Sequence, residues 1–369
     1  MKSSTPIKRP LQGNKQRILL LVLALFVAAG SLALLSLRAA GPFVAVEPES
    51  GSRTAPAAGI QDTTASGGQA VRFGPASSST KFTLVVMPDT QFTAQSWPAD
   101  FMNMTAWIRD KAAELNIAYV LHEGDVQENP IPPTYQYFEN ARRAMNQLDG
   151  HVPYVVAIGN HDFDAWYTGQ NEGIAADRRA TVFNRYFPVS KFQNWPTFGS
   201  SHPAGTNDNS FHKFRAGGTD WGIVTLKFKP TAAELAWANS IVSANPTRRF
   251  IILTHEYLFG NGTRTPAGTQ MWNELVSKYK NVQFVFSGHV YPTSARRVDA
   301  GVNGNQVHQL LIDYQAYSVR EPNSYIRLMT FDTAARTITV KSYSPPFNKY
   351  MTGAADDFVL TGVPFGPVQ

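Results

Sequence analysis

The sequence predicts an α/β fold, and three observations support this prediction. From Lys81 onward, short apolar runs alternate with longer stretches whose apolar residues recur at helical spacing. The chain has 369 residues, of which 43% are hydrophobic and only 16% charged, so it can bury a large core. After Val307 the pattern indicates strands alone. We therefore expect an α/β domain with a β-rich C-terminal part.

Near the N-terminus, residues 18–37 are a run of 20 uncharged and mostly apolar residues. As a helix this run would extend about 30 Å, the thickness of the hydrocarbon core of a bilayer. Five positive charges precede it, which favours a cytoplasmic basic tail at 1–17 and export of the rest. We expect a single-pass signal anchor in the cell membrane, with the C-terminal domain extracytoplasmic. A cleaved signal peptide, which would leave the protein secreted, is the alternative.

Residues 38–80 are predicted to be a flexible linker, because Pro, Gly, Ser, Thr and Ala dominate its second half. One domain is expected after it, over 81–369. The net charge of +6 arises outside that domain, because residues 1–38 hold six basic residues and no acidic one, which leaves 27 of each sign elsewhere. No nucleic-acid-binding surface is therefore evident. The absence of Cys from the sequence excludes disulfides, thiolate metal sites and thiol nucleophiles.

The expected strands are short runs rich in Val, Ile, Leu, Phe and Tyr between turn-forming residues. In chain order they are Phe82–Met87, Ile117–Leu121, Tyr154–Ile158, Gly222–Phe228, Phe250–Leu253, Val282–Phe286, Val307–Ile312, Tyr325–Phe331 and Thr337–Ser342. Helices are expected between some of these strands, near 98–115, 133–148, 231–244 and 268–279. Pro98 and Pro133 suit the first turn of a helix.

Five of these strands are followed directly by residue types that bind metal ions. These residues are Asp89, Asp125 after Gly124, the run Gly159-Asn160-His161-Asp162, His255, and His289 after Gly288. Because ligand sites in α/β sheets lie beyond the carboxyl ends of the strands, we expect these side chains to meet at one edge. A mixed set of oxygen and nitrogen ligands suits manganese, iron or zinc better than calcium or magnesium. A divalent ion held there can activate water and neutralise phosphate oxygens.

In this order, the five motifs resemble those of the calcineurin-like metallophosphoesterase family, over roughly Lys81 to the C-terminus. The resemblance implies an αββα sandwich of two mixed β-sheets flanked by helices. It also implies a two-metal site and the hydrolysis of phosphomonoesters or phosphodiesters. The first motif, Asp-Thr-Gln at 89–91, and the stretches 209–221 and 307–315 are similar to a bacterial extracytoplasmic branch of the family.

The resemblance implies a set of metal ligands. Asp125 corresponds to the carboxylate that bridges both metals, and Asp89 to a ligand of the first metal. Asn160, His255 and His289 correspond to the remaining ligands of the second metal. We call the ligands around Asp89 the first site and those around the two histidines the second site.

The resemblance also implies a catalytic pair. His161 corresponds to the residue that contacts the substrate phosphate or protonates the leaving group. Glu128 stands where relatives carry a carboxylate that orients this histidine. Such a partner is expected to raise the pKa of the imidazole and to fix its tautomer.

Two departures from the fullest family pattern both fall on the first site. Gln91 stands where Asp-x-His would place a histidine, and Tyr291 stands where Gly-His-x-His would place another. We therefore expect one tightly bound ion in the second site and a weaker one in the first. Gln91 then supplies an amide oxygen, or Tyr291 supplies a phenolate, or the second ion arrives only with the substrate.

The sequence thus indicates a metal-dependent phosphoesterase that acts through metal-activated water. The losses at the first site leave an alternative open. In that alternative, the chain is a surface-displayed protein that binds metal or phosphate on a phosphoesterase scaffold and has lost most turnover. The retained His161 and Glu128 favour the enzyme, because a binding protein has no need of an oriented acid.

Overall fold

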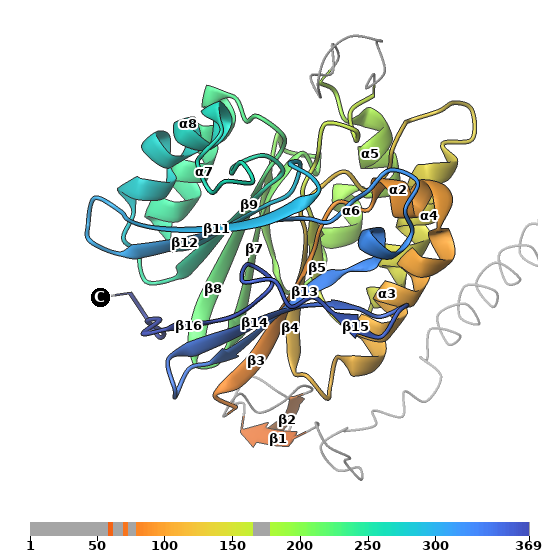
Figure 1. The fold of residues 1–369 in the computed structure, drawn as a ribbon. Helices are drawn as coiled ribbons and strands as arrows, with labels where there is room; N and C mark the ends of the chain where they lie inside the picture. Colours follow the sequence, from red (N-terminus) through yellow and green to blue (C-terminus); the bar gives the residue numbers. More distant parts are fainter. Residues whose placement is uncertain (1–57, 62–68, 73–78, 165–177, 369) are drawn as a thin grey trace, which may run out of the picture. The chain divides into compact units, whose positions relative to one another are not determined.

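Two seven-stranded sheets form the body of residues 75–369 in the computed structural model (Figure 1). The structure describes residues 58–61, 69–72, 79–164 and 178–368. Each sheet combines parallel and antiparallel pairs, so both are mixed sheets as expected. Residues 1–74 form a separate unit, in which β1 (Ala58–Gln61) and β2 (Gln69–Arg72) pair antiparallel inside the segment predicted as linker.

The first sheet contains four neighbouring parallel strands. They are β8 (Thr219–Leu226), β9 (Arg249–Thr254), β10 (Val282–Ser287) and β12 (Gln306–Asp313). The antiparallel strands β11 (Thr293–Ala300), β7 (Asn209–Ala216) and β6 (Phe198–His202) complete it at its two sides.

The second sheet contains three neighbouring parallel strands. They are β3 (Lys81–Met87), β4 (Ile117–His122) and β5 (Tyr154–Val156). Four strands from the C-terminal part of the chain extend this sheet on the β3 side, namely β13 (Ile326–Asp332), β14 (Thr337–Ser344), β15 (Lys349–Tyr350) and β16 (Asp357–Thr361).

The two sheets pack face to face around an aromatic core. Phe82 on β3 and Phe331 on β13 stack on each other, and both lie against Trp221 from the other sheet. Fully burying side chains of this size stabilises the fold by about 1.5–3 kcal/mol each. Each sheet thus buries the apolar inner face of the other.

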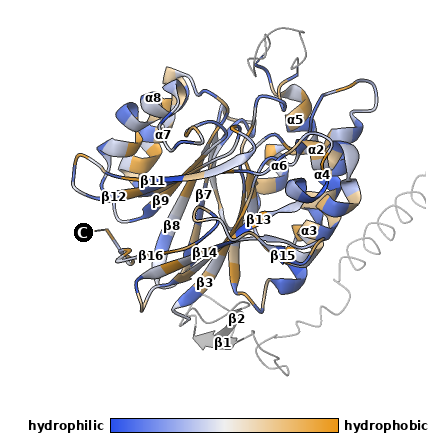
Figure 2. Ribbon diagram, in the orientation of Figure 1, coloured by the Kyte–Doolittle hydropathy of each residue, from blue (hydrophilic) through white to orange (hydrophobic). Residues whose placement is uncertain are grey.

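Helices cover the outer faces of both sheets. α3 (Pro98–Lys111) and α4 (Gln136–Met145) pack on the sheet of β3, β4 and β5. α7 (Ala232–Ala244) and α8 (Pro266–Glu274) pack on the other sheet. Figure 2 shows hydrophobic and hydrophilic residues on each of these helices, as a helix between a core and water requires. The expected arrangement of two mixed sheets flanked by helices is confirmed.

Several expected bounds are corrected by local chemistry. Pro133 does not lie in a first helical turn, because α4 begins at Gln136. The helix expected near 98–115 ends at Lys111, and that near 268–279 divides into α8 and a 3₁₀ turn at Val276–Lys278. α8 starts earlier than expected because the Thr265 side chain accepts a hydrogen bond from the Gly268 N–H and caps it.

Several helices and strands were not expected at all. They are α2 (Gln91–Ser96), α5 (Thr181–Tyr186), α6 (Val189–Phe192) and the strands β6, β7, β11, β15 and β16, with 3₁₀ turns at Asn146–Leu148 and Glu321–Ser324. Within the described ranges, no helix combines the length and the apolar character needed to cross a bilayer. The anchor predicted at 18–37 lies outside those ranges.

Candidate metal centre

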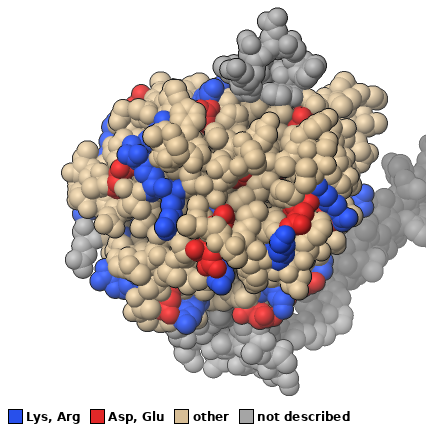
Figure 3. Space-filling view, viewed as in Figure 1, with Lys and Arg blue, Asp and Glu red and all other residues tan. Residues whose placement is uncertain are grey.

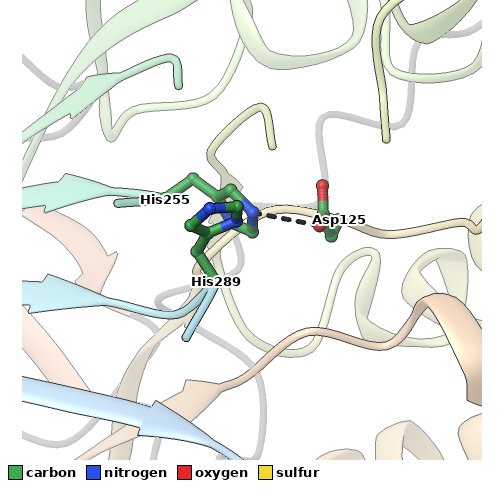
Figure 4. A group of neighbouring side chains, drawn as sticks. All are labelled: Asp125, His255 and His289. Atoms are coloured by element: carbon green, nitrogen blue, oxygen red, sulfur yellow. Dashed lines mark ion pairs between the residues drawn. The ribbon is translucent and has the colours of Figure 1, made fainter. Parts of the chain in front are cut away.

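The parallel strands of both sheets end at one edge, and the predicted ligands follow them there. Asp125, His255 and His289 follow β4, β9 and β10, and each offers one ligand atom within 4.8 Å of the other two. Figure 4 shows the two imidazole rings side by side and the Asp125 carboxylate facing them. The sequence-predicted ligands therefore come together from three different strands.

Asp125 lies at the centre of this group and is held in a demanding backbone conformation. Its φ is +49°, in the left-handed region, and Gly124 before it has a φ of +106°. Gly159 approaches so closely that a Cβ atom there would lie 2.0 Å from Oδ1 of Asp125. The backbone N–H of His161 donates to the same Oδ1 at 2.8 Å. The glycines are thus required to bring two loops against this carboxylate.

His255 points its Nε2 atom at the other ligands because Nδ1 is tied to the backbone. Nδ1 donates to the carbonyl of Glu123 at 3.0 Å. Nε2 then lies 3.0 Å from Oδ2 of Asp125 and 3.1 Å from Oδ1 of Asn160. A backbone carbonyl that fixes one nitrogen is a common way of orienting a metal-binding histidine.

Asp125 and the histidines around it shift one another's pKa values. Burial alone would raise the pKa of Asp125, but His255, His161 and His289 outweigh it and hold that pKa at about 2. Burial would lower the pKa of His255, but Asp125 raises it overall. Burial, followed by repulsion from His255, lowers the pKa of His289 to about 3. His289 is therefore neutral, the form of imidazole that binds metals.

Asp89 lies under the end of β10, within reach of both sites. The backbone N–H of His289 donates to its Oδ2 at 3.2 Å. A Cβ atom on Gly288 would lie 2.0 Å from its Oδ1, so a glycine is required there too. Burial, with repulsion from Asp313 and Asp125, raises the pKa of Asp89 well above its usual range. Asp89 and Asp313 share a side-chain hydrogen bond in this arrangement.

His122 and Asp162 support the motifs from behind. The Gly124 N–H donates to Nδ1 of His122, whose Nε2 donates to the Thr90 hydroxyl at 2.9 Å. Burial lowers the pKa of His122 to about 3, so the ring stays neutral. Asp162 accepts hydrogen bonds from the backbone N–H groups of Val126 and Gly159. These two buried side chains lock three of the motif loops together.

His161 and Glu128 lie together as expected, but one expectation about them is wrong. Nδ1 of His161 donates to the Glu128 carbonyl at 2.7 Å, and Oε2 of Glu128 lies farther away, at 3.4 Å. Burial lowers the pKa of His161 more than Asp125 and the Glu128 carbonyl raise it. Burial, with repulsion from Asp125, raises the pKa of Glu128 to about 8. Glu128 therefore holds the ring mainly through its backbone carbonyl, and the pKa of the imidazole is lowered by burial rather than raised as we predicted.

A cavity of about 480 Å³ opens above these residues. Gln91, Asn160, His161 and Tyr291 line it, with Tyr291 54% exposed at its rim. Sequence reasoning missed three other residues that line it, namely Phe92, Gln315 and Tyr317. Gln315 lies in the stretch 307–315 that marked the chain as similar to a branch of the family, which was the one available signal.

Three features of this centre fit divalent ions. Oxygen atoms of Asp125 and Asn160 converge on Nε2 of His255, where a metal can replace a proton. The amide oxygens Oε1 of Gln91 and Gln315 are buried and have no hydrogen-bond partner in the part of the chain that the structure describes. Mixed nitrogen and oxygen donors of this kind suit transition metals. The residues present therefore fit the metal site that their pattern implies.

Charged side chains of both signs lie on the surface of the domain. On the face seen in Figure 3, Lys and Arg lie singly or in short groups with Asp and Glu beside them. Ion pairs such as Arg297 with Asp299 also bring charges of opposite sign together. No large single-sign field is visible on that face.

The two facing sheets, the ligands at the shared strand ends and the open cavity define a metal-dependent phosphoesterase architecture. The family model described as calcineurin-like phosphoesterase matches residues 82–292. The chain belongs to the calcineurin-like phosphoesterase family.

Three individual proteins are similar to this chain. A protein of Bacillus subtilis (strain 168), named uncharacterized protein YvnB, is 34% identical over 293 residues; the match covers 76% of this chain but only 22% of that protein. A purple acid phosphatase from yellow lupin (Lupinus luteus) seeds superposes with a TM-score of 0.51 at 14% identity, over 79% of this chain and 56% of that one. A dimetal phosphatase of Danio rerio gives a TM-score of 0.49 at 12% identity, over 76% of this chain and 98% of that one.

Proposed function

We propose that this protein hydrolyses a phosphomonoester or a phosphodiester with the help of two divalent ions. The observation that carries the proposal is the convergence of Asp125, His255 and His289, of which Asp125 and His289 line an open cavity. When bound, the ions supply an activated water and neutralise charge on the phosphate. The proposed ligands of the second site are Asp125, Asn160, His255 and His289, and Asp89 belongs to the first.

Asn160 and His161 are the side chains placed to act on the substrate itself. Both line the cavity next to Asp125. Because Nδ1 of His161 donates to a carbonyl, Nε2 of the neutral ring is an acceptor. The negative charge of a bound phosphate favours protonation of that nitrogen, which could then give its proton to the leaving oxygen. Glu128 and Gln91 hold the ring in place from two sides.

The metals are proposed to be manganese, iron or zinc, with one ion bound tightly and the other weakly. The second site offers imidazole nitrogens, which these metals prefer. At the first site Gln91 is buried beside His161, whereas Tyr291 is more than half exposed. The amide of Gln91 is thus the better placed of the two atypical ligands.

The alternative of a binding protein with lost turnover is not favoured. A protein that only bound phosphate would need the metal ligands but not the contact between Glu128 and His161. Both of these residues line the cavity beside Asp125. Only phosphate binding without turnover at any metal concentration would restore this alternative.

The location of the enzyme is proposed from the sequence. The apolar run at 18–37 and the five positive charges before it support a membrane anchor, with 1–17 cytoplasmic, 38–80 as a linker and 81–369 as the extracytoplasmic domain. Protease added to intact cells tests this arrangement, because it would release the domain only if the domain is outside.

The test of the activity uses the full chain, purified in detergent and stripped of metal with a chelator. Manganese, iron or zinc is then added back with bis(p-nitrophenyl) phosphate, and in parallel with p-nitrophenyl phosphate. We expect turnover that returns with metal and is lost in Asn160→Ala. The control is Asn239→Ala on α7, whose side chain only bonds to backbone carbonyls of α7 and α8. Absence of turnover with every metal and both esters would contradict the proposal.

A further inference from the structure

The strongest unused feature of the cavity is Gln315, which follows β12. Gln315 is only 2% exposed and lines the same cavity as Asp125 and Gln91. Its Oε1 has no hydrogen-bond partner among the described residues. A buried amide oxygen without a partner is costly in a folded protein. Such an atom at the wall of a metal centre indicates a missing ligand.

Asp313 fixes the direction in which this amide points. The backbone N–H of Gln315 donates to Oδ1 of Asp313 at 3.1 Å, and its side-chain Nε2 donates to Oδ2 of the same residue, also at 3.1 Å. Both donors are thereby used on the Asp313 carboxylate. Oε1 is left as the atom of Gln315 that can face the cavity.

The topology places this pair on the side of the first site. β10 and β12 are parallel, with Ser287 paired to Leu311, so His289 and Asp313 are equally far past that pair. Asp89 reaches the same place from the other sheet, where it accepts from the His289 N–H and shares a hydrogen bond with Asp313. The end of β12 therefore adjoins the ligand that the first motif supplies.

Gln91 repeats the arrangement from the first motif. Gln91 is also 2% exposed, and its Nε2 lies 3.3 Å from Nε2 of His161. Its Oε1 also lacks a hydrogen-bond partner among the described residues. Two buried amide groups thus line the same cavity, each with its nitrogen engaged and its oxygen unpartnered.

We propose that Oε1 of Gln315 is a ligand of the first metal, together with Asp89, Asp125 and Gln91, and that Asp313 positions it. The first site is then built from oxygen atoms alone, in contrast to the two imidazoles of the second site. Oxygen donors suit hard divalent cations such as Mn²⁺ or Mg²⁺, whereas imidazole nitrogens suit Zn²⁺. This inference rests on the proposed function only in assuming that the centre binds metal, and metal content can be measured without turnover.

The experiment measures Mn²⁺ per chain by elemental analysis after equilibrium dialysis, and affinity by titration calorimetry. Wild-type protein, Gln315→Leu and Gln315→Glu are compared. The matched control is Gln283→Leu on β10, because Gln283 is also buried, also has an unpartnered Oε1, and uses its Nε2 on the Pro364 carbonyl. Thermal unfolding shows whether each variant is folded.

We expect two Mn²⁺ per wild-type chain and per Gln283→Leu chain. In Gln315→Leu we expect one, with the affinity for the weaker ion reduced by at least about 10-fold. Gln315→Glu keeps a ligand oxygen but replaces the amide that donates to Asp313 with a second carboxylate, so it should still hold two ions. Two undiminished ions in Gln315→Leu would overturn the proposal, as would loss of the second ion in Gln315→Glu if the leucine variant did not fold. A wild-type chain that binds no metal would instead overturn the proposed function.

Discussion

The two halves of the metal centre differ in how their ligands are held. In the second half, His255 is tied to a backbone carbonyl and its free nitrogen already contacts Asp125 and Asn160. In the first half, Asp89 shares a hydrogen bond with another carboxyl group, and two amide oxygens have no partner among the described residues. The second half is thus held by contacts within the chain, and we propose that a cation satisfies the two amide oxygens of the first half.

If Gln315 is a ligand as proposed, the first site persists although both of its motif histidines are absent. The two missing histidines are at positions 91 and 291, but the new side chain at the wall is Gln315, from a strand end outside both motifs. All the parallel strands end at the same edge, so a neighbouring strand can supply what a motif no longer does. The following changes test the contrast, from the largest expected effect to the smallest.

His255→Ala should have the largest effect, because it removes a direct ligand of the second half. We expect loss of the tightly bound ion and a fall in kcat of about 100-fold or more. The control is His308→Ala, which removes a buried histidine that stacks on Phe284 away from the centre. If His255→Ala left metal content and turnover unchanged, His255 would not be a ligand of the tightly bound ion.

Gly159→Ala and Gly288→Ala should distinguish the metal binding of the two halves. At Gly159 the new Cβ would meet both Oδ1 and the backbone N of Asp125, at 2.0 and 2.5 Å, whereas at Gly288 it would meet the Asp89 carboxylate alone. We expect Gly159→Ala to weaken both ions and to destabilise the fold by about 1–3 kcal/mol. Gly288→Ala should weaken only the ion of the first half.

Urea unfolding and metal titration measure both effects of these glycine changes. Gly260→Ala is the control, because its Cβ would meet only the Thr293 side chain, at 3.1 Å. Equal loss of both ions in Gly159→Ala and Gly288→Ala would mean that the two halves are not distinct.

The stability of the metal-free protein should fall as pH rises, in part through Glu128. Its pKa is about 8 in the folded protein and near 4.5 when unfolded, so the native state holds a proton that the unfolded chain releases between these values. The contribution of this group to stability is therefore complete below pH 4.5 and is lost as the pH rises to 8, by on the order of 5 kcal/mol. Urea unfolding with a chelator at pH 5 and pH 8 should show a smaller decline in Glu128→Gln. An identical decline in the two proteins would contradict this reading of the site.

Tyr291→Phe should have the smallest effect. The side chain is 54% exposed at the rim of the cavity, so removing its hydroxyl leaves the first half intact if Gln91 and Gln315 supply the ligands. Two Mn²⁺ per chain and a kcat within about 2-fold of wild type are expected. Loss of one ion would instead support a phenolate ligand at the first site.

Apolar runs and their periodicity are local signals, so they predicted most of the strands and the α/β class, whereas the sandwich was implied by the resemblance of the five motifs to the family. The residues after β4, β9 and β10 could also be predicted to meet at one edge, because parallel strands share their carboxyl ends. The sequence could not reveal Gln315, because only the pairing of β10 with β12 places that residue at the centre. The pKa of His161 was mispredicted because burial, which pattern alone does not report, outweighs the nearby acid.

The most direct test of the central claim is anomalous diffraction from crystals soaked in Mn²⁺ and, separately, in Zn²⁺. We predict two Mn²⁺ peaks, one against His255 and His289 and one surrounded only by oxygen atoms that include Oε1 of Gln315. With limiting Zn²⁺ we predict a peak only at the two histidines. A second peak coordinated by Tyr291, or two zinc peaks of equal height under the same limiting conditions, would contradict the claim that the two halves differ in their chemistry.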